Sequence, residues 1–224
     1  MKKLFQKFYN FIKLKVKNNK IKSIFLLLLL VVYYFSLPRQ LFENKYSTVI
    51  ESQDGQLLGA KIASDGQWRF PESDSIPYKF EKCIVAFEDQ HFYKHFGFNP
   101  ISMYHAFQQN RKANRVVRGG STLTQQVIRL HRKGKSRSYF EKGIEMILAT
   151  RLEFRHSKDK ILELYCAHAP FGSNVVGLEM ASWKYFGLQP HQLSWAEAAT
   201  LAVLPNAPSL IYPGKNQERL LAKR

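Results

Sequence analysis

The feature that most constrains this chain is an uncharged apolar block near its N-terminus. Residues 23–38 contain no charged side chain and include five consecutive leucines. The block is slightly shorter than the ~20 residues that a membrane-spanning helix usually needs. Eight lysines and no acid precede it, which predicts a cytoplasmic tail at 1–22, one transmembrane helix at 23–38 and an exterior location for the rest. The lysines are Lys2, Lys3, Lys7, Lys13, Lys15, Lys17, Lys20 and Lys22.

The flanks of the block favour an anchor that is retained. Tyr33 and Tyr34 suit the outer interface, and the side chains of Lys20 and Lys22 can extend toward the inner one. A cleaved signal peptide is the alternative, but its leader would be unusually long and no small-x-small cleavage site follows. We therefore expect an uncleaved anchor whose basic tail lies on the anionic cytoplasmic leaflet.

Charge and composition narrow the possible partners. The net charge is +17, and the chain without its eight leading lysines still carries +9, which suits an anionic substrate, lipid or nucleic acid. Nucleic acid is disfavoured because the most basic segment adjoins the predicted membrane span. The apolar fraction of 45% and the length of 224 residues suit one folded domain plus an appendage. Cys83 and Cys166 lie in apolar surroundings and are expected to be buried thiols rather than a disulfide.

Strand signals are confined to the segment that follows the apolar block. Between Ser47 and Phe70, β-type residues flank the pairs Asp54-Gly55 and Asp65-Gly66, which predicts a short hairpin or meander. Pro77 is expected to open the next helix. Helical patterns dominate after Phe70, so the sequence predicts a mainly α fold with a small β region.

A cluster of polar and aromatic residues follows the predicted helix that starts near Pro77. Its apolar positions recur at helical spacing as far as Phe87, so one face packs inward. The stretch from Glu88 to Gly97 then holds two acids, two histidines and three aromatics. A carboxylate at Glu88 would be partly desolvated there. The alternative is an ordinary helix C-terminus with Gly97 as its stop.

A second polar stretch runs from Gly119 to Gln126. Its two glycines allow the backbone to approach a ligand, and Ser121 or Thr122 can cap the helix that follows. A helix N-terminus with free amides is a potential anion site. An ordinary Gly-Gly turn with a cap is the alternative.

The segments around this stretch predict further helices. The turn Asn99-Pro100 precedes a helix from Ile101 to roughly Asn110, and we expect a basic mobile loop from Arg111 to Arg118. A later helix is expected to face inward with Ile144, Ile147, Leu148 and Leu152. Ser157 and Ser194 are candidate helix caps.

These motifs together resemble a known family. Residues 88–97 read E-D-x-x-F-x-x-H-x-G and resemble the first signature of the peptidoglycan glycosyltransferases. Residues 119–126 resemble the second signature and 158–165 the fourth, in the same order. Residues 169–183 most resemble the penicillin-binding protein 1C branch of class A. The chain departs from the family where Glu141 replaces an arginine and where Cys166 and Ala167 replace a leucine and an asparagine.

The resemblance implies a fold and a reaction. The fold would be lysozyme-like and mainly α, with a juxtamembrane β-containing segment at 39–71 and the glycosyltransferase domain at 72–224. The reaction would polymerise lipid II into glycan strands, with inversion at the anomeric carbon and release of undecaprenyl pyrophosphate. The enzyme would work at the bacterial cytoplasmic membrane, with its catalytic domain periplasmic or extracellular.

The resemblance also assigns roles to residues and partners. Glu88 is the expected catalytic base and Glu145 a second catalytic residue on the pyrophosphate side. The expected partners are lipid II, the nascent glycan strand, membrane lipids and a transpeptidase or other cell-wall synthesis protein. The pyrophosphate would be neutralised with or without a divalent cation, Mg²⁺ or Mn²⁺. The expected substrate-binding residues are Asp89, Phe92, His95, Arg118, Gly120, Ser121, Thr122, Gln126, Arg129 and Lys142.

Two other functions and one further motif are alternatives to this interpretation. A membrane-anchored lytic transglycosylase or lysozyme-like hydrolase would share the fold class and a catalytic glutamate. An inactive cell-wall scaffold would account for the departures at Glu141, Cys166 and Ala167. The Ser157-x-x-Lys160 match to a transpeptidase nucleophile is rejected because no Lys-Thr-Gly partner follows. The sequence leaves open whether the chain is a truncated bifunctional protein or a single-domain polymerase.

Overall fold

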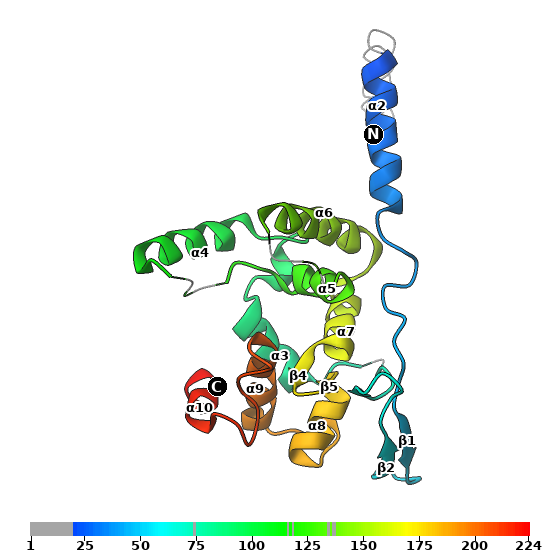
Figure 1. Cartoon of the computed structure of the whole chain (residues 1–224), viewed down its shortest axis with the longest axis vertical. Helices are drawn as coiled ribbons and strands as arrows, with labels where there is room; N and C mark the ends of the chain where they lie inside the picture. The colour runs from blue at the N-terminus through cyan, green and yellow to red at the C-terminus, as the bar shows by residue number, and fades with distance from the viewer. Residues whose placement is uncertain (1–19, 74, 116, 118, 134, 136–137) are drawn as a thin grey trace, which may run out of the picture. The chain divides into compact units, whose positions relative to one another are not determined.

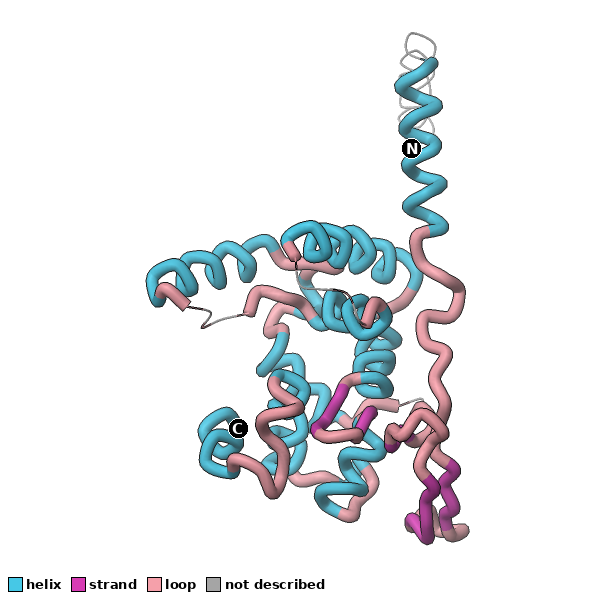
Figure 2. Tube along the Cα trace, viewed as in Figure 1, coloured by secondary structure: helices cyan, strands magenta, loops and turns pink. Residues whose placement is uncertain are grey.

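The computed structural model describes residues 20–73, 75–115, 117, 119–133, 135 and 138–224. The chain divides into two compact units, Met1–Arg39 and Gln40–Arg224. Residues 1–19, with six of the eight leading lysines, lie outside the described residues. Figure 1 labels the helices and strands, and Figure 2 shows how little of the chain is strand.

The first unit contains one described helix. Helix α2 spans Lys20–Phe35, and its residues after Ser23 are all apolar or aromatic. Within the described part of the chain, no helix is both long and apolar enough to cross a membrane. The transmembrane segment at 23–38 therefore stays a prediction.

The β region of the second unit is formed by two small sheets. Strand β1 (Thr48–Glu51) pairs antiparallel with β2 (Leu57–Lys61) around the first Asp-Gly pair, which confirms the hairpin. The second Asp-Gly pair does not extend this sheet into a meander. It leads instead to β3 (Trp68–Arg69), which pairs in parallel with β5 (Val175–Val176), and β5 pairs antiparallel with β4 (Pro170–Gly172).

Helices make up most of the second unit, as predicted. In Figure 1, α4, α5 and α6 form one tier and α3, α8, α9 and α10 form another, with α7 between them. Helix α5 packs against α6 and α7, and α3 packs against α9. The helices are α3 (Tyr78–Glu88), η1 (Phe92–Lys94), α4 (Pro100–Ala113), α5 (Leu123–His131), α6 (Tyr139–Arg155), α7 (Lys158–His168), α8 (Leu178–Phe186), η2 (Pro190–Gln192), α9 (Trp195–Val203), η3 (Leu204–Asn206) and α10 (Gln217–Lys223).

Local sequence sets where these helices begin. The side chain of Asn99 caps α4 by accepting from the amide of Ser102, and Ser138 and Ser157 cap α6 and α7 in the same way. Ser194 forms a capping box at α9, as its spacing from Glu197 predicts. Both cysteines are free thiols; Cys166 is buried as expected, whereas Cys83 is only partly buried.

Two expectations about helical segments were wrong. Helix α4 continues to Ala113 and ends at Asn114 in the left-handed conformation, so the first part of the predicted loop 111–118 is helical. In α6, Leu148 and Leu152 are buried as predicted, but Ile147 is 57% exposed. The buried face of α6 instead includes Glu145, one helical turn before Leu148 and Ala149.

Gly97 and Gly120 both allow a loop to pack closely against a helix. Helix α3 already ends at Glu88, so Gly97 is not its stop. Gly97 has φ +81°, and a Cβ there would lie 2.6 Å from the amide nitrogen of Thr150. A Cβ on Gly120 would lie 3.0 Å from Cα of Met103. Both glycines therefore let a loop lie directly on a helix, Gly97 on α6 and Gly120 on α4.

Candidate active site

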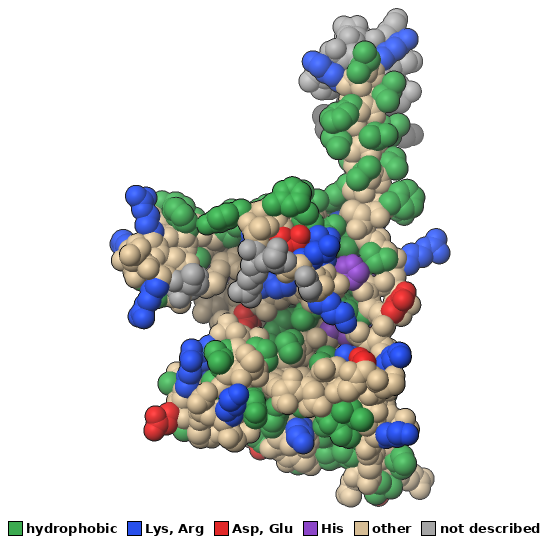
Figure 3. Space-filling view, in the orientation of Figure 1, with side chains coloured by type: hydrophobic (Ala, Val, Ile, Leu, Met, Phe, Trp, Pro, Cys, Tyr) green, Lys and Arg blue, Asp and Glu red, His purple; other side chains and the backbone are tan. Residues whose placement is uncertain are grey.

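A cleft of about 1010 Å³ lies in the second unit and brings the two polar stretches together. The end of α3 contributes Glu88, and the loop before α5 contributes Gly120 and Ser121. The space-filling view shows this face hollowed between the two tiers, with basic side chains along the margin (Figure 3). The basic residues that line the cleft are Arg129, Arg132, Lys133, Lys135, Lys142, Arg219 and Lys223.

The two carboxylate oxygens of Glu88 differ in their hydrogen bonding. Its Oε2 accepts a hydrogen bond from Nε2 of Gln126 at 2.8 Å. Its Oε1 is buried and has no hydrogen-bond partner among the described residues. Burial raises the pKa of Glu88, and this is partly offset by the Gln126 hydrogen bond and by the charge of Lys223. A carboxylate held in this way can accept a proton from a ligand hydroxyl.

Asp89 connects the end of α3 to the start of α5. Its Oδ2 accepts from the amide of Leu123 at 3.0 Å and lies 2.8 Å from Nε2 of His95. Phe92 is fully buried and makes an edge contact with the His95 ring. Asp89 lines the cleft, whereas Phe92 and His95 do not. The contacts of Asp89 hold the end of α3, the segment around His95 and the start of α5 together.

Thr122 joins the second polar stretch to the first. Its hydroxyl donates to the carbonyl of Gly97 at 2.6 Å and accepts from the amide of Gln125 at 3.2 Å. The side chain of Gln125 accepts in turn from the Thr122 amide at 3.1 Å, which completes a capping box. The amides of Thr122, Leu123 and Gln125 are thus already bonded within the protein. The expectation of free amides at this helix start is wrong for these three groups.

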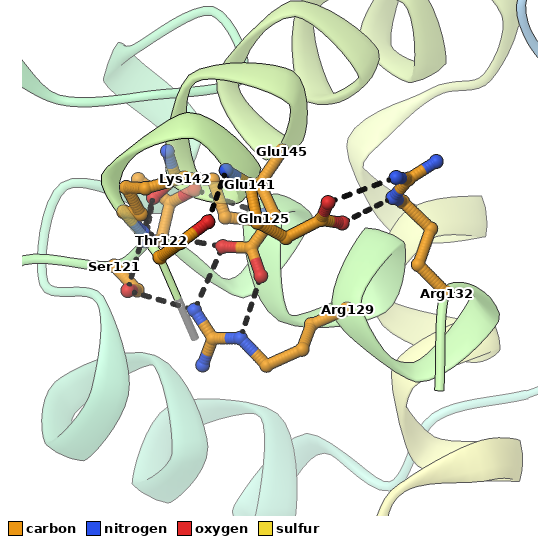
Figure 4. Close-up of polar contacts among 9 residues, drawn as sticks. Ser121, Thr122, Gln125, Arg129, Arg132, Glu141, Lys142 and Glu145 are labelled. Atoms are coloured by element: carbon orange, nitrogen blue, oxygen red, sulfur yellow. Dashed lines mark hydrogen bonds and ion pairs between the residues drawn. The ribbon is translucent and has the colours of Figure 1, made fainter. Parts of the chain in front are cut away.

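Cationic side chains, rather than those amides, provide positive charge in this part of the cleft. Arg129 contacts both carboxylate oxygens of Glu145 at 2.9 Å and donates to the hydroxyl of Ser121 at 3.2 Å. Lys142 donates to the same hydroxyl at 2.7 Å and to Glu145 at 3.4 Å. Figure 4 shows these side chains from α5 and α6 converging on one another. They form a preorganised cationic group around Ser121.

Glu145 supports this group as an ionised partner. It is 6% exposed on the buried face of α6. Burial alone would raise its pKa, but the hydrogen bond and charge of Arg129 and the charge of Lys142 hold the pKa below the ordinary value. A buried acid stays charged when it is paired and hydrogen-bonded in this way. Its contacts position Arg129 and Lys142.

Within the described ranges, no group of three or more histidine, cysteine or acidic side chains is placed to hold a metal ion. The carboxylate of Glu145 is already paired with Arg129 and Lys142. Mg²⁺ is commonly bound through one or two carboxylates together with substrate phosphates. A divalent cation at the pyrophosphate, Mg²⁺ or Mn²⁺, therefore stays a prediction, and we derive no step through it.

Sequence reasoning missed part of the cleft. Arg219 and Lys223 lie four residues apart on α10 and both line it. Their helical spacing was a usable signal. Arg132 also lines the cleft and holds Glu141 with two contacts, at 2.5 and 3.0 Å. Of the predicted site residues, Arg118 lies outside the described residues.

Comparison of the sequence with models of protein families identifies the family of this chain. The model described as "Transglycosylase" matches residues 54–224. The chain belongs to the transglycosylase family. The match confirms the resemblance drawn from the two polar stretches, and residues 54–224 form a peptidoglycan glycosyltransferase module. The mainly α fold with a small β region is confirmed as well.

Several penicillin-binding proteins are similar in sequence to this transglycosylase module. Penicillin-binding protein 1C of Escherichia coli strain K12 is 41% identical over 194 residues, covering 84% of this chain and 24% of that protein. Penicillin-binding protein 1A of Aquifex aeolicus strain VF5 is 36% identical over 201 residues, covering 89% of this chain and 28% of that protein. Penicillin-binding protein 1F of Bacillus subtilis strain 168 is 35% identical over 178 residues, covering 77% of this chain and 24% of that protein. The chain therefore spans about a quarter of the length of these relatives.

Proposed function

We propose that this transglycosylase module polymerises lipid II into glycan strands and releases undecaprenyl pyrophosphate. The observation that carries the proposal is one shared cleft. Glu88 and the cationic group of Arg129 and Lys142 line the same space. A base on one side and positive charge on the other suit transfer of a sugar from a diphosphate donor.

The proposed reaction needs one proton transfer and one displacement. Glu88 takes the proton of the acceptor 4-hydroxyl as that oxygen forms a bond with the donor anomeric carbon. The bond from that carbon to the diphosphate oxygen breaks, and the diphosphate leaves with the bonding electrons. Attack from the face opposite the leaving group inverts the anomeric carbon.

The cationic group would act on the departing diphosphate. Diphosphate is a good leaving group, so charge neutralisation serves better than a strong acid. Lys142 and Arg129 already converge on the hydroxyl of Ser121, and Glu145 fixes their positions. Such preorganised charge stabilises the developing anion without rearrangement during the reaction.

We also infer an anchored arrangement at the bacterial cytoplasmic membrane. Its support is the uncharged block at 23–38, the lysines before it and the helical conformation of Lys20–Phe35. An anchor confines the enzyme to the surface that holds the lipid tail of its substrate, which raises their effective concentration. The proposed partners are lipid II, the growing strand, membrane lipids and a transpeptidase or other cell-wall synthesis protein.

Purified protein incubated with labelled lipid II tests the proposal. Polymer that depends on the carboxylate of Glu88 is expected, so Glu88→Gln should reduce turnover by at least ~100-fold, as loss of a general base does. Glu43→Gln is the matched control, because Glu43 is exposed and does not line the cleft. Cleavage of finished glycan without polymer would favour the hydrolase, and full activity of Glu88→Gln would remove the assigned base.

A further inference from the structure

The ion pair between Arg132 and Glu141 is part of the cleft but takes no part in the steps above. Arg132 Nε and Nη2 contact the two carboxylate oxygens of Glu141 at 2.5 and 3.0 Å. Both side chains line the cleft that contains Glu88 and Lys142. Figure 4 shows the pair beside the Arg129–Glu145 pair, with Arg132 directed toward Glu141.

The chemistry of this contact is the chemistry of phosphate binding. A guanidinium presents two parallel N–H groups that fit a carboxylate or a phosphate in the same bidentate way. Glu141 therefore occupies the edge of Arg132 that a diphosphate would use. Arg132 lowers the pKa of Glu141 through its hydrogen bond, so the carboxylate is ionised at neutral pH. An ionised Glu141 also repels an entering diphosphate.

The two arginine pairs in the cleft differ in how readily they can open. Glu145 is on the buried face of α6 and is held by both Arg129 and Lys142. Glu141 lies in the first turn of the same helix, where its side chain has Arg132 as its ion-pair partner among the described residues. Both carboxylates are mostly covered, with exposed side-chain fractions of 14% for Glu141 and 8% for Glu145. The pairs differ in the number of cations, because Glu141 is held by Arg132 whereas Glu145 is held by both Arg129 and Lys142. Arg132 therefore separates from Glu141 more readily than Arg129 separates from Glu145.

We propose that Glu141 is an internal competitor that occupies Arg132 in the empty cleft and weakens retention of the diphosphate product. The proposal rests on the function proposed above for the identity of the ligand. It assigns a role to the position where this chain carries an acid and the family signature has an arginine. It also implies that Arg132 contributes fully to anion binding only when Glu141 is neutral.

Binding of inorganic pyrophosphate to the full chain in detergent, measured by calorimetry, tests this without any turnover. We expect Glu141→Gln to bind about tenfold more tightly, the size of one charge-assisted hydrogen bond to an anion. Glu163→Gln is the matched control, because it breaks the Lys160–Glu163 pair on α7 outside this cleft. Its affinity should equal that of the unmodified chain.

The double variant Arg132→Gln, Glu141→Gln separates the specific effect from general charge. We expect the double variant not to show the tighter pyrophosphate binding of Glu141→Gln. A gain that persists without Arg132 would overturn the proposal, as would unchanged or weaker binding in Glu141→Gln with an unchanged melting temperature. Absence of pyrophosphate binding in every variant would contradict both proposals. Absence of polymer with the expected binding pattern would contradict the proposed function alone.

Discussion

At the scale of single residues, Glu88 illustrates how opposing effects set one protonation state. Burial raises its pKa, and the hydrogen bond from Gln126 and the charge of Lys223 lower it. The charge of Lys223 favours the ionised form of Glu88 more strongly than the charge of Arg129 does. A residue near the C-terminal end of the chain therefore helps to keep the proposed base ionised.

This balance predicts a shift in the acid limb of the pH–rate profile. Removing the charge with Lys223→Met should raise the pKa of Glu88 further. As the pH is lowered, Glu88 is then protonated earlier, and activity falls at a higher pH than in the unmodified chain. The measurement is kcat/KM for lipid II against pH. Arg219→Met is the control, because Arg219 lines the cleft but is not among the charges that act on Glu88. An acid limb that does not move in Lys223→Met contradicts the prediction.

Glu179 gives a second prediction, which concerns stability rather than activity. Burial, followed by the charge of Glu51, raises its pKa from 4.5 to about 7. The fold therefore binds this proton more tightly than the unfolded chain, and the corresponding stability is lost as pH rises through about 7. Glu179→Gln should be more stable than the unmodified chain at pH 8 by ~1–2 kcal/mol, discounted for partial exposure.

Chemical denaturation at two pH values measures the effect of Glu179. The two proteins should have similar free energies of unfolding at pH 4.5, where the glutamate is largely protonated in the fold. Equal stabilities at pH 8 would show that Glu179 is ionised in the fold without cost.

At the scale of elements, the start of α5 is where the two polar stretches meet. The Thr122 hydroxyl bonds Gly97 and Gln125, and Asp89 accepts from the Leu123 amide. Thr122→Ala should lower the free energy of unfolding by ~1–2 kcal/mol, because it removes a helix cap and a buried hydrogen bond. Thr122→Ser, which keeps the hydroxyl, should recover most of the loss. Urea denaturation of both variants checks this, and equal losses would contradict it.

The loop at Gly97 gives a prediction with an internal control. Gly97 and Gly66 both have positive φ, +81° and +74°, so alanine is strained at either position. A Cβ on Gly97 would also collide with the backbone of Ala149 and Thr150 in α6, whereas one on Gly66 meets nothing within 4 Å. Gly66→Ala should cost ~1 kcal/mol, and Gly97→Ala clearly more. Equal melting temperatures would contradict the role of close packing.

At the scale of the whole molecule, the beginning of the second unit is held by two helices. The carbonyl of Leu41 lies 2.6 Å from Nδ1 of His131 on α5. Asn44 lies 3.0 Å from Nδ1 of His168 on α7, and the ring of Phe42 stacks on that histidine at 3.7 Å. Residues 40–46 are thus part of the folded unit rather than a free linker.

These contacts predict where the chain can be shortened. A chain of residues 40–224 should fold with the melting temperature of the second unit, whereas residues 47–224 should melt several degrees lower because Phe42 and the two histidine contacts are lost. Circular dichroism of the two chains measures this. Equal melting temperatures would show that residues 40–46 do not stabilise the fold.

The sequence by itself determined the features that depend on near neighbours. Thr122, Ser138, Ser157 and Ser194 all cap helices, because a cap is a hydrogen bond to a backbone amide three residues ahead. The Asp54-Gly55 hairpin has the same local origin. The family and the mainly α fold also followed from motifs that are continuous in the chain.

The tertiary structure alone decided the features that depend on residues distant in sequence. Ile147 is exposed because the packing of α5 and α7 on α6 selects a buried face that contains Glu145. The amide of Leu123 is bonded because folding brings Asp89 beside it. Lys223 lines the cleft with Glu88, although 134 residues separate them. Periodicity and motifs carry no information about such contacts, since the chain must fold before these groups meet.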